Sequence, residues 1–268
     1  MESLKITSTH NPRIRAAAKL RQRGAREDEG QTLIDGWREI ERAAASGVRL
    51  VAIFLPDNAP LDAGRRVWIK SLETQFGTQL YELTEGPYRR VAFGQHETGP
   101  VAIAETPRLT LDQLQLPDEP LIAVVEGVEK PGNLGAILRS ADGAGVDAVI
   151  AVDPATDLYN PNVIRASLGT IFAVPVCAAT ADAARQWLAR QVDRIVVTRV
   201  DGAADYHQTD YRGRCAIVLG SEAEGVTGTW RTGECVGVRI PMRGIADSLN
   251  VSAAAAILFY EAQRQREG

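Results

Sequence analysis

The chain has 268 residues, of which 45% are hydrophobic and 24% are charged, and its net charge is −4. This is the composition of an ordinary globular protein, long enough for one large domain or two modest ones. The sequence contains no apolar run that would span a bilayer, and its N-terminal stretch lacks the hydrophobic core of a signal peptide. The three cysteines are isolated and the three histidines lie far apart. The sequence therefore predicts a cytoplasmic protein without disulfides, a metal site or a membrane anchor.

Positive charge is concentrated near the N-terminus, although the whole chain is acidic. No acidic residue lies between Ser3 and Arg26, and the basic residues there are Lys5, Arg13, Arg15, Lys19, Arg21, Arg23 and Arg26. A second cluster places Tyr88 and Phe93 on either side of a pair of arginines. Such patches can bind phosphates on an acidic protein, and the alternative for each is a solvated surface. For the Tyr88 cluster alone we favour the solvated surface.

The first hundred residues or so are predicted to form a compact α/β module. Asn11 and Pro12 give a helix-start signal, and a basic helix is expected to run to about Arg23 and to stop at Gly24. Further strands are expected at 32–34, 50–55, 80–83 and 101–104, with helices at 37–46 and 61–76. Residues 106–120 contain three prolines and no clear period, so they are the best linker candidate. This places one domain at 1–105 and a second at 121–268.

The second domain is predicted to hold a parallel sheet with helices on both faces. Its strands are near-continuous apolar runs separated by helical stretches, which is typical of that arrangement. We expect strands at 121–125, 148–152, 195–198 and 215–219, and helices at 134–144, 161–168 and 181–191.

Three stretches in this half share a strand end followed by a glycine-containing turn and a helix. In EKPGNLGAILRSADGAG, residues 129–145, Asn133 is either a helix cap or a functional group, and Arg139 is either a surface residue or a functional one. In IVLGSEAEGV, residues 217–226, Gly220 permits close approach of a ligand to the backbone. The alternative interpretation of Ser221 is a simple cap of this turn. The alternative interpretation of Glu222 and Glu224 is that they are solvated acids of a first helical turn.

The third stretch, IPMRGIADSLNVSAAAAILFY, covers residues 240–260. Ser248 is the expected N-cap of a largely buried helix that begins at Leu249. Ser248 and Asn250 lie where this helix starts, and polar groups in that position are either caps or ligand contacts. A dinucleotide-binding site is the obvious competitor, since residues 143–148 match its loose glycine fingerprint. That match ends a helix and leads into a strand, which is the wrong context for a phosphate-binding turn.

Taken in order, the three stretches resemble the signature motifs of the SPOUT superfamily, in its SpoU or TrmH-like branch of RNA ribose 2'-O-methyltransferases. The resemblance covers roughly residues 121–261. It implies an α/β fold with a deep trefoil knot, a homodimer, and S-adenosyl-L-methionine as the cofactor, bound in a bent pose. The N-terminal module is similar to the ribosomal-protein-like RNA-recognition domain of such enzymes. One departure from the family pattern is Ala223, which replaces a glycine and puts the geometry of that turn in doubt.

The resemblance also assigns roles to residues at the matching positions. Arg139 would be the central catalytic residue, and because an arginine is a poor base we expect it to clamp a phosphate and stabilise the developing alkoxide. The other residues expected at the reaction centre are Asn133, Glu222, Ser248 and Asn250. The residues expected to hold the cofactor are Leu219, Gly220, Ile240, Met242 and Leu249. The residues expected to contact RNA are Arg13, Arg15, Lys19 and Arg21 of the basic stretch, and Arg165.

The sequence thus predicts an enzyme that methylates a ribose 2'-hydroxyl, with ribosomal RNA of the large subunit as the favoured substrate. Transfer RNA is the alternative substrate. The alternative from a different class is a non-catalytic RNA-binding protein that keeps the fold.

Overall fold

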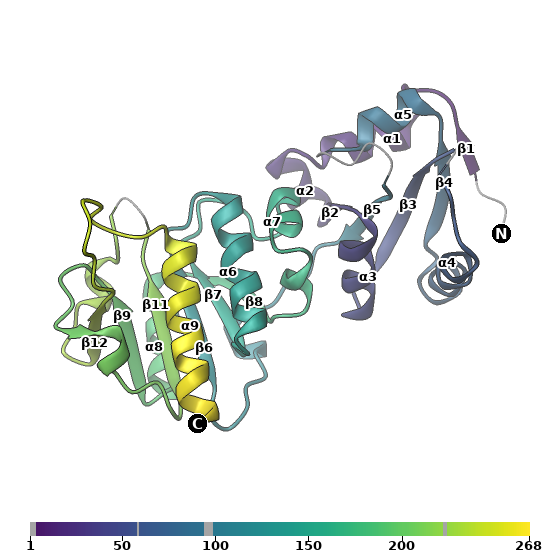
Figure 1. Cartoon of the computed structure of the whole chain (residues 1–268). Helices are drawn as coiled ribbons and strands as arrows, with labels where there is room; N and C mark the ends of the chain where they lie inside the picture. The colour runs from purple at the N-terminus through teal and green to yellow at the C-terminus, as the bar shows by residue number, and fades with distance from the viewer. Residues whose placement is uncertain (1–3, 58, 94–98, 222–223) are drawn as a thin grey trace. The chain divides into compact units, whose positions relative to one another are not determined.

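The computed structural model of the chain describes residues 4–57, 59–93, 99–221 and 224–268. These residues form two compact units (Figure 1). The first unit comprises Met1–Pro107 and Tyr159–Phe172, and the second comprises Arg108–Leu158 and Ala173–Gly268. The sequence had placed the whole of 121–268 in one domain, so the assignment of Tyr159–Phe172 differs.

Local contacts explain why Tyr159–Phe172 groups with the first unit. The hydroxyl of Thr32 donates to the carbonyl of Tyr159 at 2.7 Å, and Nη1 of Arg42 donates to the carbonyl of Leu168 at 2.8 Å. Both partners sit on elements of the first unit, so the segment is tied to that unit by hydrogen bonds as well as by packing.

The first unit is built on a five-stranded mixed sheet in the order β1–β4–β3–β5–β2. Its strands are β1 (Leu4–Ile6), β2 (Gln31–Asp35), β3 (Leu50–Pro56), β4 (Gln79–Leu83) and β5 (Val101–Glu105). Its helices are α1 (Pro12–Lys19), α2 (Arg23–Glu29), α3 (Trp37–Ala45), α4 (Ala63–Phe76), α5 (Glu85–Val91), α7 (Pro161–Ala166) and η2 (Thr170–Phe172). Ile14 of α1 packs into a core with Phe54 and Tyr81 of the sheet.

The basic helix is shorter than predicted and is followed by a second one. Helix α1 ends at Lys19 and α2 begins at Arg23, so Gly24 lies inside a helix instead of ending one. The glycine that stops α2 is Gly30, whose φ of 63° is left-handed. Arg26 is buried and donates to the carbonyl of Leu20 at 2.7 Å, which fastens the turn between the two helices.

The second unit contains a seven-stranded sheet in the order β10–β12–β9–β11–β6–β7–β8, and all its pairings are parallel. This confirms the predicted α/β class with a parallel sheet. The strands are β6 (Leu121–Glu126), β7 (Ala148–Val152), β8 (Val176–Ala179), β9 (Arg194–Thr198), β10 (Ala204–Asp205), β11 (Cys215–Leu219) and β12 (Cys235–Arg239). The helices are α6 (Pro131–Gly143), α8 (Ala181–Gln191) and α9 (Val251–Glu267), with short 3₁₀ turns η1 (Leu111–Gln113), η3 (Tyr206–Gln208) and η4 (Gly228–Trp230).

Helices cover both faces of this sheet (Figure 1). Because side chains alternate along a strand, Ile122 and Val124 of β6 face the same side, and they share a core with Leu188 of α8 and Trp230 of η4. Helices α6 and α9 lie side by side and are seen on the opposite face. Within the ranges described above, no helix is long and apolar enough to cross a membrane.

The start of α9 differs from the expectation. The helix begins at Val251, and its N-cap is Asn250, whose side-chain oxygen accepts from the backbone N–H of Ser252 at 2.9 Å. Ser248, the expected cap, lies two residues earlier and is exposed. The polar residue that caps the start of this helix is therefore Asn250.

Candidate active site

The carboxyl ends of the parallel strands β9, β11 and β12 meet at one edge of the sheet, and a cavity of about 670 Å³ lies among the loops that leave them. In open parallel sheets this edge is where ligands bind. All five residues predicted to hold the cofactor line this cavity: Leu219, Gly220, Ile240, Met242 and Leu249. Ser248, predicted at the reaction centre, lines it as well.

Gly220 shapes the cavity through contacts with its own loop. A Cβ atom at this position would lie 2.1 Å from the carbonyl carbon of Gly225 and 2.5 Å from the nitrogen of Val226. Such distances are impossible, so only glycine lets the chain turn back on itself here. The turn is closed by two backbone hydrogen bonds of 3.0 Å between Ser221 and Gly225. The sequence had interpreted Gly220 as a point of ligand approach, and the structure adds this constraint from the loop itself.

One side of the same cavity is lined by paired charges. Arg199 donates to both carboxylate oxygens of Asp201, at 2.9 Å and 2.7 Å, and this hydrogen bonding lowers the pKa of Asp201 to about 2. Nε of Arg239 donates to Asp205 at 2.8 Å. The sequence gave no signal for these residues, because their place at the cavity depends on the pairing of the two-residue strand β10 with β12.

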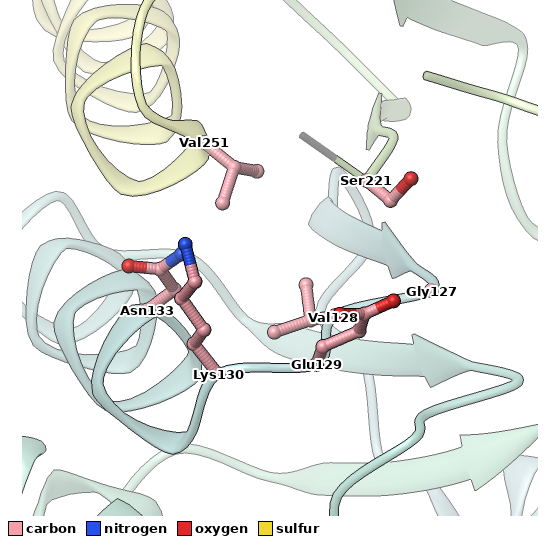
Figure 2. A pocket seen from close by; sticks show the side chains of 7 residues that line it. All are labelled: Gly127, Val128, Glu129, Lys130, Asn133, Ser221 and Val251. Atoms are coloured by element: carbon pink, nitrogen blue, oxygen red, sulfur yellow. The ribbon is translucent and has the colours of Figure 1, made fainter. Parts of the chain in front are cut away.

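A second cavity, of about 150 Å³, adjoins the first, since Ser221 and Val251 line both (Figure 2). Figure 2 shows Lys130 and Asn133 at the start of α6, Val251 at the first turn of α9, and Ser221 across the opening. Nδ2 of Asn250 donates to Oδ1 of Asn133 at 3.2 Å. The structure thus brings together the first and third sequence motifs, which are 117 residues apart at this contact. Lys130, three residues before Asn133 in the first motif, was not singled out from the sequence.

Arg139 occupies a different place from the other predicted catalytic residues. It is exposed on α6 and lines neither cavity. Six residues along a helix correspond to about 9 Å of rise from Asn133. Glu222 lies outside the described residues. Counting only those residues that are described, no group of three or more His, Cys, Asp or Glu side chains is placed to hold a metal.

The residues predicted to contact RNA belong to the first unit. Arg13, Arg15 and Lys19 are exposed on α1, and Arg13 lies over the ring of Tyr81 with its Cζ 5.5 Å from the centroid. Arg21 donates to the carbonyl of Ala92 and lies over the ring of Phe93. Arg165 is half-buried on α7 and donates to Asn162 at 3.1 Å.

A parallel α/β sheet with a ligand-sized cavity at its strand ends, bounded by a glycine-dependent turn, is typical of α/β proteins that bind a small molecule at that edge. Comparison with known proteins narrows the class. Residues 120–260 match the SpoU rRNA Methylase family, and residues 11–102 match the MRM3-like substrate binding domain. The chain belongs to the SpoU rRNA methylase family, which confirms the resemblance drawn from the three motifs.

Individual relatives match nearly the whole chain. The 23S rRNA (uridine(2479)-2'-O)-methyltransferase of Streptomyces viridochromogenes is 30% identical over 280 residues, which cover 97% of each chain. A crystal structure of an RNA 2'-O ribose methyltransferase is 38% identical with a TM-score of 0.84, covering 99% of this chain and 100% of the other. The AdoMet-bound rRNA methyltransferase of Sinorhizobium meliloti is 25% identical with a TM-score of 0.88, over 97% of both chains.

Proposed function

We propose that this protein transfers the methyl group of S-adenosyl-L-methionine to a ribose 2'-hydroxyl of large-subunit ribosomal RNA. The observation that carries the proposal is the cavity at the strand ends of a SpoU rRNA methylase domain, lined by every residue expected to hold the cofactor. The full-length relative named for 23S rRNA supports ribosomal over transfer RNA, because its match includes the first unit. A ribosomal RNA substrate also supports a cytoplasmic location.

The larger cavity would hold the cofactor. Its volume of about 670 Å³ lies within the roughly 300–1,000 Å³ usual for small-molecule sites. Leu219, Gly220 and Ile240 are at the ends of β11 and β12, where backbone N–H and C=O groups would contact the adenine and ribose. A solved relative is named as AdoMet-bound, which supports the same ligand here.

In the reaction a bond forms between the 2'-oxygen and the methyl carbon while the bond from that carbon to the sulfonium sulfur breaks. The hydroxyl proton must leave, and the reacting atoms must be held in line, so positioning supplies much of the rate. We assign Arg139 to the phosphate and developing alkoxide of the target nucleotide. Asn133, Glu222, Ser248 and Asn250 are assigned to the reaction centre.

We further propose that the protein acts as a homodimer and that its C-terminal part is threaded as a trefoil knot, as the resemblance of its three motifs to the SPOUT superfamily implies. Helices α6 and α9 pack side by side, and their outer surface carries Arg139 and Tyr260, the latter 51% exposed. A second copy seated on this surface would explain why a residue assigned to the reaction centre lines neither cavity of its own chain.

Isothermal titration calorimetry tests the cofactor assignment. Folded protein should bind S-adenosyl-L-methionine and its demethylated product, S-adenosylhomocysteine, with dissociation constants in the micromolar range, about 10⁻⁶–10⁻⁵ M. Absence of heat and of competition with both ligands would remove the basis for a methyltransferase.

A further inference from the structure

Glu126 is a buried carboxylate for which the sequence motifs assign no role. It is the last residue of β6 and is 4% exposed. The alternation of side chains places it on the same face of the sheet as Ile122 and Val124, which is the face that η4 covers. A buried charge is costly unless hydrogen bonds satisfy it, so its presence at the end of an apolar strand requires an explanation.

Three donors converge on this carboxylate, and all come from one loop. Oε2 accepts from the backbone N–H of Thr227 at 2.8 Å. Oε1 accepts from the hydroxyl of Thr227 at 2.8 Å and from Nε1 of Trp230 at 3.0 Å. Trp230 is fully buried and Thr227 is exposed. Glu126 therefore holds the loop that follows β11 through hydrogen bonds from one exposed residue, Thr227, and one core residue, Trp230.

That loop forms part of the cavity assigned to the cofactor. Gly220, Gly225 and Val226 line the cavity, and Thr227 follows directly after them. Strands β6 and β11 pair with Val125 opposite Leu219, so Glu126 lies level with the point where the loop leaves the sheet.

Gly127, the residue after Glu126, also lies close to the loop that follows β11, at the smaller cavity. Gly127 has a φ of 64°, and a Cβ built on it would lie 3.4 Å from the Cβ of Ser221. Gly127 and Ser221 both line that cavity, together with Asn133. Glu126 thus directly precedes residues 127–130, and it is hydrogen-bonded to the loop that follows β11.

We propose that Glu126 is a positioning residue for methyl transfer: its carboxylate holds residues 224–230, which follow β11, beside residues 127–130, which follow β6, and so sets the shape of the cofactor cavity. This inference rests on the proposed function. A merely structural role predicts lower thermal stability with unchanged cofactor affinity of the folded protein. A positioning role predicts weaker affinity and slower transfer in protein that is still folded.

Glu126→Gln is the informative substitution because it keeps the shape and places one NH₂ group among the donors. In one amide orientation the NH₂ faces the backbone N–H of Thr227, and in the other it faces Nε1 of Trp230. Either way one N–H points at another, which pushes the loop away. Trp230→Phe removes the second conflict, because the amide oxygen then accepts from the Thr227 N–H while the NH₂ donates to the Thr227 hydroxyl.

The experiment is calorimetric titration of S-adenosyl-L-methionine into the wild type, Glu126→Gln, Trp230→Phe and the double variant, all well below their unfolding temperatures. We expect Glu126→Gln to weaken binding about tenfold or more, and the double variant to recover most of that loss, as expected for groups that interact directly. Val149→Ala, in buried strand β7, is the control that lowers stability without changing affinity. Wild-type affinity in Glu126→Gln, or a double variant no tighter than it, would overturn the proposal.

Two further measurements keep the proposal testable if Glu126→Gln folds poorly or the ligand is wrong. Thr227→Val removes the hydroxyl donor from an exposed position and should weaken binding severalfold. Thr227→Ser keeps both the hydroxyl and the backbone N–H donor and should bind like the wild type. Unchanged binding in Thr227→Val would contradict the proposal. Hydrogen–deuterium exchange needs no ligand. Amides of 220–230 should exchange faster in Glu126→Gln than in Val149→Ala, and equal exchange would overturn the proposal even if wild-type protein binds no cofactor.

Discussion

The turn at the cavity requires a residue without a Cβ atom at position 220. A side chain there cannot be accommodated, because the backbone of Gly225 and Val226 occupies its space. Arg139 is the opposite case: its side chain is exposed and lines neither cavity. Substitution of Gly220 therefore tests cofactor binding, and substitution of Arg139 tests methyl transfer.

Gly220→Ala should displace the 220–226 turn and weaken S-adenosyl-L-methionine binding about tenfold or more, with a stability loss above about 1 kcal/mol from the forced backbone shift. Gly228→Ala is a matched control in the same loop, since a Cβ at Gly228 meets no atom within 4 Å. Calorimetry on both variants checks this. Equal affinity in Gly220→Ala and Gly228→Ala would show that the turn does not shape the site.

Arg139→Ala should abolish methyl transfer while stability changes by less than about 0.5 kcal/mol, because the side chain is exposed. Cofactor affinity should stay close to that of the wild type, as the residue lines neither cavity. Arg139→Lys should also fail, since lysine keeps the charge and loses the planar fork of donors. Single-turnover methylation by folded protein is the measurement, and near wild-type rates in Arg139→Lys would contradict the assigned role.

At the scale of elements, the start of α9 joins structure to chemistry. Asn250 caps the helix and donates to Asn133 on α6, so one side chain links two helices that lie side by side. Ser248 lines the larger cavity without being the cap. Ser248 is therefore assigned to the reaction centre alone, whereas Asn250, two positions away, is assigned to both the helix cap and the reaction centre.

Asn250→Ala should lower stability by about 1 kcal/mol, the usual cost of losing an N-cap. Ser248→Ala should leave stability within about 0.5 kcal/mol and slow methyl transfer, since we assign it to the reaction centre. Thermal unfolding and single-turnover rates, measured on both variants, test this division. If Ser248→Ala unfolds as readily as Asn250→Ala, the exposed serine has a structural role that the geometry does not indicate.

Long apolar strands and their glycine turns were predictable from the sequence because each is a local pattern. Strands β6, β7, β9 and β11 fall where the apolar runs are, within a residue or two. Strands β8 and β10 have four and two residues, too few for a period to show. The five cofactor positions came from the motifs, and their common cavity from the fold.

Features that depend on distant partners had no local signal. The grouping of Tyr159–Phe172 with the first unit depends on contacts such as that of Thr32 with Tyr159, 127 residues away. The partners of Glu126 are more than 100 residues further along the chain. A charged residue that ends an apolar strand was the one available hint for Glu126, and it could not indicate which loop would supply the donors.

At the scale of the whole molecule, we assign RNA binding to the first unit and the chemistry to the second. The basic helix α1 belongs to the first unit, and the cavities belong to the second. Deleting the first unit is a poor test of this division. The segment Tyr159–Phe172 would lose its packing partners, and buried residues such as Ile164 and Ile171 would be exposed.

Charge substitutions on α1 test the division more cleanly. Arg15→Gln combined with Lys19→Gln should weaken RNA binding and reduce the slope of log affinity against log salt by about 1.4–1.8, for two lost phosphate contacts. Cofactor affinity should not change. Arg49→Gln is a matched control, because Arg49 is already paired with Glu105 at 2.7 Å in the same unit. An unchanged salt slope in the double variant would place the RNA elsewhere.

The measurement that tests the central claim most directly uses the chemistry of the product. Purified protein is incubated with S-adenosyl-L-methionine carrying a labelled methyl group and with total RNA from cells that lack its gene, and the RNA is then hydrolysed in alkali. A ribose 2'-O-methyl group blocks cleavage at its own nucleotide, because the 2'-oxygen can no longer attack the adjacent phosphate. We predict that the label is recovered in alkali-resistant dinucleotides from 23S rRNA. Label in mononucleotides, which marks a methylated base, or no transfer to 23S rRNA at all, would contradict the account.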